Sequence, residues 1–150
     1  MITEKTIEAV NETATRTLGE KIGHLLKGGE VIELVGDVGA GKTTFVKGLA
    51  TGLAIEETVQ SPTFTISRIY DARNGLLLAH YDFYRLNDAG IMADELAETT
   101  KDPDTITVIE WADIVEGVLP DDRLRITFTA PTETTRRLQI TGSLPIMEKL

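Results

Sequence analysis

A glycine-rich segment followed by lysine and threonine carries the clearest chemistry in this sequence. Residues 36–43 read Gly-Asp-Val-Gly-Ala-Gly-Lys-Thr and match G-x-x-x-x-G-K-[ST] at every fixed position. Glycines at this spacing allow backbone N–H groups to turn inward around phosphate oxygens. Lys42 would then bridge the β- and γ-phosphates of a nucleotide, and the Thr43 hydroxyl would bind Mg²⁺, which prefers oxygen ligands. The segment therefore predicts a phosphate-binding loop.

The residues on either side of this loop support the prediction. Residues 30–35 are short, apolar and β-branched, which indicates a buried strand, and apolar residues recur with helical period from Lys42 to Gly52. Strand, glycine loop and helix is the order that phosphate binding requires. A glycine-rich turn that merely joins two elements is one alternative. A dinucleotide-binding loop fits less well, because glycines at 36, 39 and 41 do not follow G-x-G-x-x-G.

Two acidic residues end predicted strands elsewhere in the chain. The strand expected at 76–82 ends in Asp82, and the strand expected at 105–110 ends in Glu110. A magnesium–nucleotide site needs such an acid to hold the metal directly or through water. Because strands of an open α/β sheet deliver their carboxyl ends to one crevice, both carboxylates can reach the loop. Either acid alone would be typical of a solvated strand end, but beside a phosphate loop we expect both to act on a nucleotide.

Three further segments have both a functional and a structural interpretation. The run Ser61-Pro-Thr-Phe64, rich in hydroxyl groups and stiffened by proline, suits a loop that senses a γ-phosphate, although taken alone it favours a plain turn before a strand. Trp111 either lies near the nucleotide or packs in the core. Residues 88–104 hold six acids and one lysine, which is typical of a solvated helix face and less often of a docking surface for a basic partner.

The remaining hydrophobic pattern predicts a mixed α/β chain. A helical stripe runs from Ala14 to Leu25, with Asn11 or Thr13 as its cap. We expect further strands at 65–70, 76–82, 105–110, 123–129 and 137–141, a hairpin turn at 74–75 and a helix at 91–99. Residues 1–150 show no repeat or linker, which predicts a single domain with a C-terminal tail at about 142–150.

Composition excludes several classes of protein. The 150 residues are 41% hydrophobic and 26% charged, which is ordinary for one globular domain. The absence of cysteine excludes disulfides and thiolate metal sites, and two histidines cannot form a histidine-rich zinc cluster, so any metal should be a hard cation. The net charge of −9 disfavours a broad surface for DNA or RNA. Because neither a signal peptide nor a membrane-spanning run is evident, we expect a cytoplasmic protein that binds no membrane.

Four separated motifs together resemble one family. They are Gly36-Asp-Val-Gly-Ala-Gly-Lys-Thr-Thr44, Ser61-Pro-Thr-Phe64, His80-Tyr-Asp-Phe-Tyr-Arg85 and Ile109-Glu-Trp111. Over roughly residues 10–140 the sequence resembles the TsaE (YjeE) family, bacterial P-loop ATPases needed to form N6-threonylcarbamoyladenosine (t6A37) on tRNA. The resemblance implies a three-layer P-loop NTPase-like fold, with a mixed, mainly parallel central sheet flanked by helices. It also implies ATP with Mg²⁺, weak intrinsic hydrolysis, and work in a complex with TsaD and TsaB that handles the tRNA.

The same resemblance implies roles for individual residues. Thr43 and Glu110 are implied as magnesium ligands, and Asp82 as the residue that contacts the nucleotide and supports catalysis at the γ-phosphate beside Lys42. Thr13 and Arg136 are implied to border the adenosine. The implied phosphate-binding residues are Asp37, Val38, Gly39, Ala40, Gly41, Lys42, Thr43 and Thr44. Residues 61–64 are implied as a switch-like loop, and residues 91–99 match the acidic helix of the family only loosely.

Three rival functions share part of this pattern. A small-molecule P-loop kinase is the main alternative, but it needs an acceptor site and usually a lid, and the sequence holds no arginine-rich lid segment. A GTPase switch would carry N-K-x-D and D-x-x-G, and neither occurs in these 150 residues. A non-hydrolysing module with a vestigial loop is disfavoured by the intact Lys42 and Thr43. Which of Asp82 and Glu110 orients the attacking water stays open.

Overall fold

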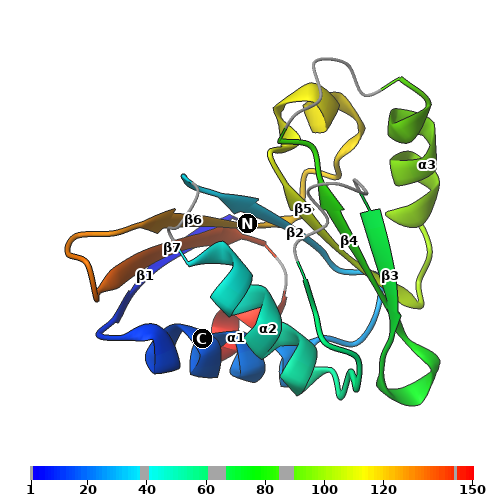
Figure 1. Ribbon diagram of the computed structural model, residues 1–150. Helices are drawn as coiled ribbons and strands as arrows, with labels where there is room; N and C mark the ends of the chain where they lie inside the picture. The colour runs from blue at the N-terminus through cyan, green and yellow to red at the C-terminus, as the bar shows by residue number, and fades with distance from the viewer. Residues whose placement is uncertain (1, 38–40, 61–66, 85–89, 144) are drawn as a thin grey trace.

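The computed structural model describes residues 2–37, 41–60, 67–84, 90–143 and 145–150. The strands of these residues form one sheet in the order β1-β7-β6-β2-β5-β4-β3 (Figure 1). They are β1 (Thr3–Ala9), β2 (Val31–Val35), β3 (Ser67–Asp71), β4 (Leu77–Asp82), β5 (Thr105–Glu110), β6 (Leu124–Thr129) and β7 (Arg136–Gly142). The α-helices are α1 (Glu12–Leu25), α2 (Lys42–Gly52) and α3 (Ile91–Thr99). Three 3₁₀ helices follow β3, β5 and β7 respectively: η1 (Arg73–Gly75), η2 (Ala112–Val118) and η3 (Pro145–Lys149). The α/β class is thereby confirmed.

Strand pairing differs between the centre of the sheet and its edges. Strand β2 lies parallel to β5 and β6, and β5 lies parallel to β4. The pairs β1–β7, β6–β7 and β3–β4 are antiparallel. The sheet is mixed, as predicted, but the expectation of a mainly parallel sheet is wrong, because three of the six pairings among the described strands are antiparallel. A short connection such as η1 can join two neighbouring strands only if they are antiparallel, because parallel neighbours need a longer crossover connection.

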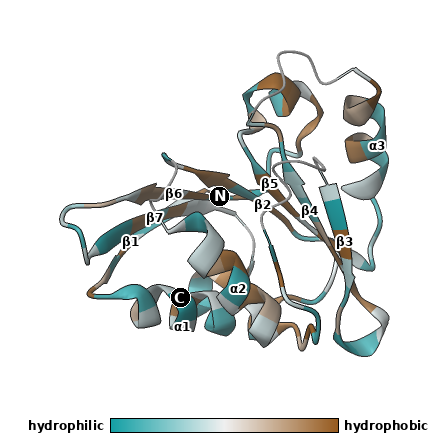
Figure 2. Cartoon of the chain, viewed as in Figure 1, coloured by the Kyte–Doolittle hydropathy of each residue, from teal (hydrophilic) through white to brown (hydrophobic). Residues whose placement is uncertain are grey.

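Helices cover both faces of this sheet. Alternate residues of a strand point to opposite faces, so Ile106 and Val108 of β5 join the core beneath α1 and α2, whereas Ile109 joins a second core beneath α3 and η2. Leu49 of α2 and Leu96 of α3 are fully buried in these two cores. In Figure 1 α1 and α2 lie on one side of the sheet and α3 on the other, and in Figure 2 hydrophobic colour follows the central strands.

Helices α1 and α2 contact each other through their backbones. A Cβ atom placed on Gly48 of α2 would lie 2.1 Å from the carbonyl oxygen of Arg16, and one on Gly52 would lie 2.3 Å from that of Glu20. Real Cβ atoms do not approach backbone oxygens so closely, so glycine is required at both positions. Helix α2, which begins at the glycine loop, is therefore held in place by α1.

Most predicted elements are confirmed, with small shifts of their boundaries. The strand expected at 65–70 is observed at Ser67–Asp71, and residues 65–66 lie outside the described residues. Asn74 and Gly75 have φ angles of 57° and 76°, as a tight hairpin turn requires. No helix among the described residues is long and apolar enough to cross a membrane.

The two ends of the chain differ from the sequence prediction. Strand β1 was not predicted, because it is an edge strand paired only with β7 and most of its side chains are exposed. The segment expected to form a tail at 142–150 instead packs on the core. Its helix η3 buries Ile146 and Met147, which are 7% and 8% exposed. Two apolar residues in one short turn are too few to produce a periodic signal in the sequence.

Candidate nucleotide and metal site

The glycine loop connects the carboxyl end of β2 to the first turn of α2. Gly36 and Gly41 have φ angles of 148° and 104°, and a Cβ on Gly36 would lie 2.8 Å from the carbonyl oxygen of Phe128 in β6. Both ends of the loop therefore need glycine. Residues 38–40, to which phosphate contacts were assigned, lie outside the described residues, and Asp37 is exposed.

The two long helices begin differently. The side chain of Asn11 caps α1 by accepting a hydrogen bond from the backbone N–H of Ala14 at 2.8 Å. Helix α2 begins at Gly41, and no side chain among the described residues caps it. The first N–H groups of an α-helix have no partner within the helix, and the helix dipole places partial positive charge there. The N-terminus of α2 is therefore suited to receive an anionic group.

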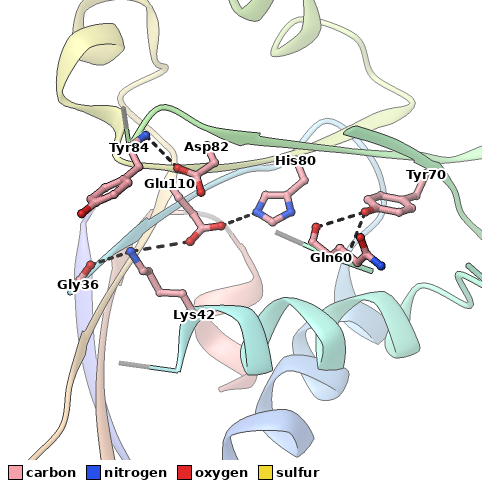
Figure 3. Close-up of polar contacts among 8 residues, drawn as sticks. All are labelled: Gly36, Lys42, Gln60, Tyr70, His80, Asp82, Tyr84 and Glu110. Carbon is pink, nitrogen blue, oxygen red and sulfur yellow. Dashed lines mark hydrogen bonds and ion pairs between the residues drawn. The ribbon is translucent and has the colours of Figure 1, made fainter. Parts of the chain in front are cut away.

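Side chains from three separate segments converge beside this helix (Figure 3). The ammonium of Lys42 donates a hydrogen bond to the carbonyl oxygen of Gly36 at 2.7 Å and lies 3.8 Å from Oε1 of Glu110. The other carboxylate oxygen of Glu110 lies 2.6 Å from Nε2 of His80. Asp82 is paired with Glu110 in the register of β4 and β5, and its Oδ1 accepts a hydrogen bond from the N–H of Tyr84 at 2.9 Å.

Burial disfavours the charge on Lys42. The side chain is 6% exposed, and this burial lowers the pKa of Lys42 below its ordinary value, although the negative charges of Glu110, Asp82 and Asp37 act in the opposite direction. An anionic ligand at Nζ would favour the charged form, because an opposite charge offsets the cost of desolvation. A buried cation of this kind beside a glycine loop is typical of a phosphate site.

Trp111 packs against the core beneath α3 and η2 and also contacts Lys42 beside the glycine loop. Its ring centroid is 4.4 Å from Nζ of Lys42, and the ring of Tyr84 lies against it at a centroid distance of 4.7 Å. Its backbone is in the left-handed region, with φ 57° and ψ 54°, which is unusual for a large side chain. Directly after β5, this strained turn aims the indole over Lys42, and such strain is concentrated at functional sites.

A cavity of about 390 Å³ lies on the other side of the first turn of α2. Its lining includes Asn11, Glu12, Thr15, Thr43, Thr44 and Arg136. The volume is in the range of small-molecule sites, and most of the lining residues are polar or charged. Thr13, assigned to the adenosine, is an exposed residue of α1, and the cavity is lined by its neighbours. Arg136 lines the same cavity, and its side chain lies 3.6–3.7 Å from where a Cβ on Gly41 would be.

The oxygen groups at the site fit a cation that arrives with a ligand. Among the described residues no group of three or more His, Asp or Glu side chains could enclose a metal. Magnesium is usually held by one or two carboxylates together with water and substrate phosphates, so a closed protein cage is not required. Thr43 in the first turn of α2 and Glu110 at the end of β5 supply a hydroxyl and a carboxylate of the right chemistry.

One residue at the centre of the site was noted in the sequence only as part of a motif. His80 precedes Asp82 by two positions, so both side chains point to the same face of β4. The two-residue spacing from Asp82 could have indicated that His80 lies at the site. It could not have shown that the ring contacts Glu110 of β5. Residues 61–64, the expected switch-like loop, lie outside the described residues.

Comparisons of the sequence with a family model and with individual proteins point to the same family. The family model for Threonylcarbamoyl adenosine biosynthesis protein TsaE matches residues 9–138. The tRNA threonylcarbamoyladenosine biosynthesis protein TsaE of Bacillus subtilis is 38% identical over 136 residues, covering 89% of this chain and 82% of that protein. The protein of the same name from Aquifex aeolicus is 45% identical over 113 residues, covering 69% and 84%.

A solved structure also resembles the whole chain. The crystal structure of Bacillus subtilis YdiB matches with a TM-score of 0.79 at 33% sequence identity, and the match covers 99% of this chain and 92% of that one. The glycine loop, Asp82, Glu110 and Trp111 all lie within the region that the family model covers. The chain therefore belongs to the TsaE family, which takes part in the biosynthesis of threonylcarbamoyladenosine on tRNA.

Proposed function

We propose that this chain hydrolyses Mg-ATP and is required for the formation of t6A37 on tRNA, acting in a complex with TsaD and TsaB. The observation that carries the proposal is the convergence of Lys42, Asp82 and Glu110 at the first turn of α2 (Figure 3). The α/β sheet with helices on both faces supports assignment to the three-layer P-loop NTPase-like folds, with residues 1–150 as one domain.

The nucleotide would lie across the first turn of α2. The N–H groups of the glycine loop and of α2 would bind the phosphates, and Lys42 would exchange its contact with the carbonyl of Gly36 for the β- and γ-phosphates. Adenosine would occupy the cavity near Arg136, with Thr13 at its border. Adenine is preferred to guanine in this proposal because the chain lacks the guanine-reading sequences.

Thr43 and Glu110 would hold Mg²⁺ with the nucleotide. The bound ion would offset negative charge on the β- and γ-phosphates. The carboxylate of Glu110 is buried beside Lys42, so a cation that arrives with the phosphates would meet it there. Asp82 would act at the γ-phosphate, since the N–H of Tyr84 holds its carboxylate beside the same strand end.

The partners would complete the function. A net charge of −9 supports contact with tRNA through TsaD and TsaB rather than through a basic surface of this chain. We place the protein in the cytoplasm, where tRNA is modified. The intrinsic hydrolysis is proposed to be weak and to be controlled by the complex.

The main test is ATP turnover with and without TsaB and TsaD, followed by an assay of tRNA modification. Lys42→Ala should lower turnover on the order of 10²–10³-fold, because it removes a charge aimed at the phosphates. Lys47→Ala is the matched control, since Lys47 is an exposed residue of the same helix. Equal turnover in the two variants would show that this loop is not the catalytic site.

Two further variants separate the roles of the acids. Glu110→Ala should weaken nucleotide binding in the presence of magnesium and leave metal-free binding nearly intact. Asp82→Ala should keep most of the binding and lose turnover, because an interaction made in the transition state affects kcat more than affinity. Calorimetric titration with ADP, with and without magnesium, distinguishes them. A metal defect in Asp82→Ala instead of Glu110→Ala would reverse the assignment.

A further inference from the structure

His80 is a buried polar residue that the proposed function does not use. It is 1% exposed and lies on β4, opposite Val108 of β5. Its Nε2 is 2.6 Å from Oε2 of Glu110. Its Nδ1 is buried and has no hydrogen-bond partner among the described residues. Among the described residues, the imidazole therefore makes its polar contact with one carboxylate oxygen, Oε2 of Glu110.

The sheet keeps this contact in a fixed geometry. The parallel register places Asp82 opposite Glu110 and His80 opposite Val108, so the imidazole reaches diagonally across to Glu110. Both side chains are buried, and a shift of β4 by one residue would turn that of His80 to the other face of the sheet. Backbone hydrogen bonds therefore determine where the ring and the carboxylate meet.

We propose that His80 is a positioning residue for Glu110. A hydrogen bond donated from Nε2–H to Oε2 holds that oxygen and leaves Oε1 facing Lys42, 3.8 Å from its ammonium (Figure 3). The carboxylate then presents one oriented oxygen to the phosphate loop. This inference rests on the proposed role of Glu110 as a magnesium ligand.

Burial costs argue that the imidazole does more than fill space. An apolar side chain of similar size would avoid burying Nδ1 without a partner. Without the imidazole, Oε2 of Glu110 would lose its donor, and the carboxylate could turn both oxygens toward Lys42. A tighter pair between Glu110 and Lys42 would oppose the release of the ammonium to a phosphate. His80 thus favours the arrangement in which both groups are available to a ligand.

The test compares His80→Phe, which fills the site without a donor, with His80→Gln, whose amide can place an N–H near the position of Nε2. Calorimetry measures ADP binding at increasing magnesium chloride and in its absence. We expect His80→Phe to require about 10–100-fold more magnesium, as is usual when the partner of a metal ligand is lost, with metal-free ADP binding unchanged. His80→Gln should recover most of the magnesium dependence.

Two controls keep the result interpretable. Thr107→Val changes a fully buried hydroxyl of β5 that has no described hydrogen-bond partner and lies on the face of the strand opposite to Glu110, so it reports a general disturbance of the sheet. Thermal unfolding checks that each variant is folded. If His80→Phe does not fold, His80→Met is the second variant without a donor.

Each outcome bears on a different statement. Normal magnesium dependence in His80→Phe, together with a loss in Glu110→Ala, would overturn the inference and leave the proposed function intact. Equal losses with and without magnesium in both His80→Phe and His80→Gln would mean a structural role and would also overturn it. Normal magnesium dependence in Glu110→Ala would refute the metal role of Glu110 in the proposed function, and the inference with it.

Discussion

The contact between α1 and α2 makes Gly48→Ala the most informative single change in the scaffold. Its new methyl group would lie 2.1, 2.9 and 3.1 Å from the O, C and Cα atoms of Arg16. All three are backbone atoms of α1, so no side-chain rotation can relieve the overlap. The two helices must move apart, and α2 would carry Lys42 and Thr43 with it.

The expected size of the effect follows from two opposing contributions. Overpacking a close contact costs about 1–3 kcal/mol, and a backbone contact belongs at the upper end of that range. Alanine gains about 1 kcal/mol over glycine within a helix. The net loss in the free energy of unfolding is therefore about 2 kcal/mol. For a chain of this size, that loss lowers Tm by roughly 4–8 °C.

Thermal unfolding of the ligand-free protein measures this loss, and calorimetry with Mg-ADP measures the effect on the site. Gly117→Ala in η2 is the matched control, because no heavy atom lies within 4 Å of its Cβ position. We expect Gly48→Ala to lose both stability and nucleotide affinity and Gly117→Ala to lose neither. A Tm for Gly48→Ala at or above that of Gly117→Ala would refute the proposed dependence on backbone contact.

Three further predictions follow. Arg73 donates hydrogen bonds to backbone carbonyls at the ends of α1 and α2, so Arg73→Ala should lower the free energy of unfolding in urea by about 2–4 kcal/mol. Arg137→Ala is the control, because it breaks an exposed ion pair and should lower that free energy by less than about 1 kcal/mol. Because burial lowers the pKa of Lys42, the folded chain binds this proton less tightly than the unfolded chain. In urea titrations, the free energy of unfolding of the wild type relative to Lys42→Met should therefore rise as pH increases from neutral toward the ordinary lysine pKa. A decrease in this difference over the same pH range would contradict the prediction. Mg-ATP should change the fluorescence of Trp111, the only tryptophan, and an equal response to Mg-GTP would argue against adenine selectivity.

Local sequence patterns determined much of the scaffold. Residues 36–43 predict a phosphate loop because glycine spacing, lysine and threonine form a pattern within one short segment. Helix α2 and strand β5 follow from hydrophobic periodicity, which is also local, and Asp82 and Glu110 were recognisable as acids that end buried strands. These features depend on neighbours in the chain, so they can be inferred without knowing how distant segments pair.

Only the tertiary structure decided which of these segments meet. The order of the sheet places β5 between β2 and β4, and this places Glu110 beside both Lys42 and His80. The left-handed turn that carries the ring of Trp111 over Lys42, and the burial of η3 in the core, have no comparable local signal. Strand order and side-chain contacts are selected by the packing of the whole chain, because each strand pattern is compatible with several neighbours until the two cores are closed.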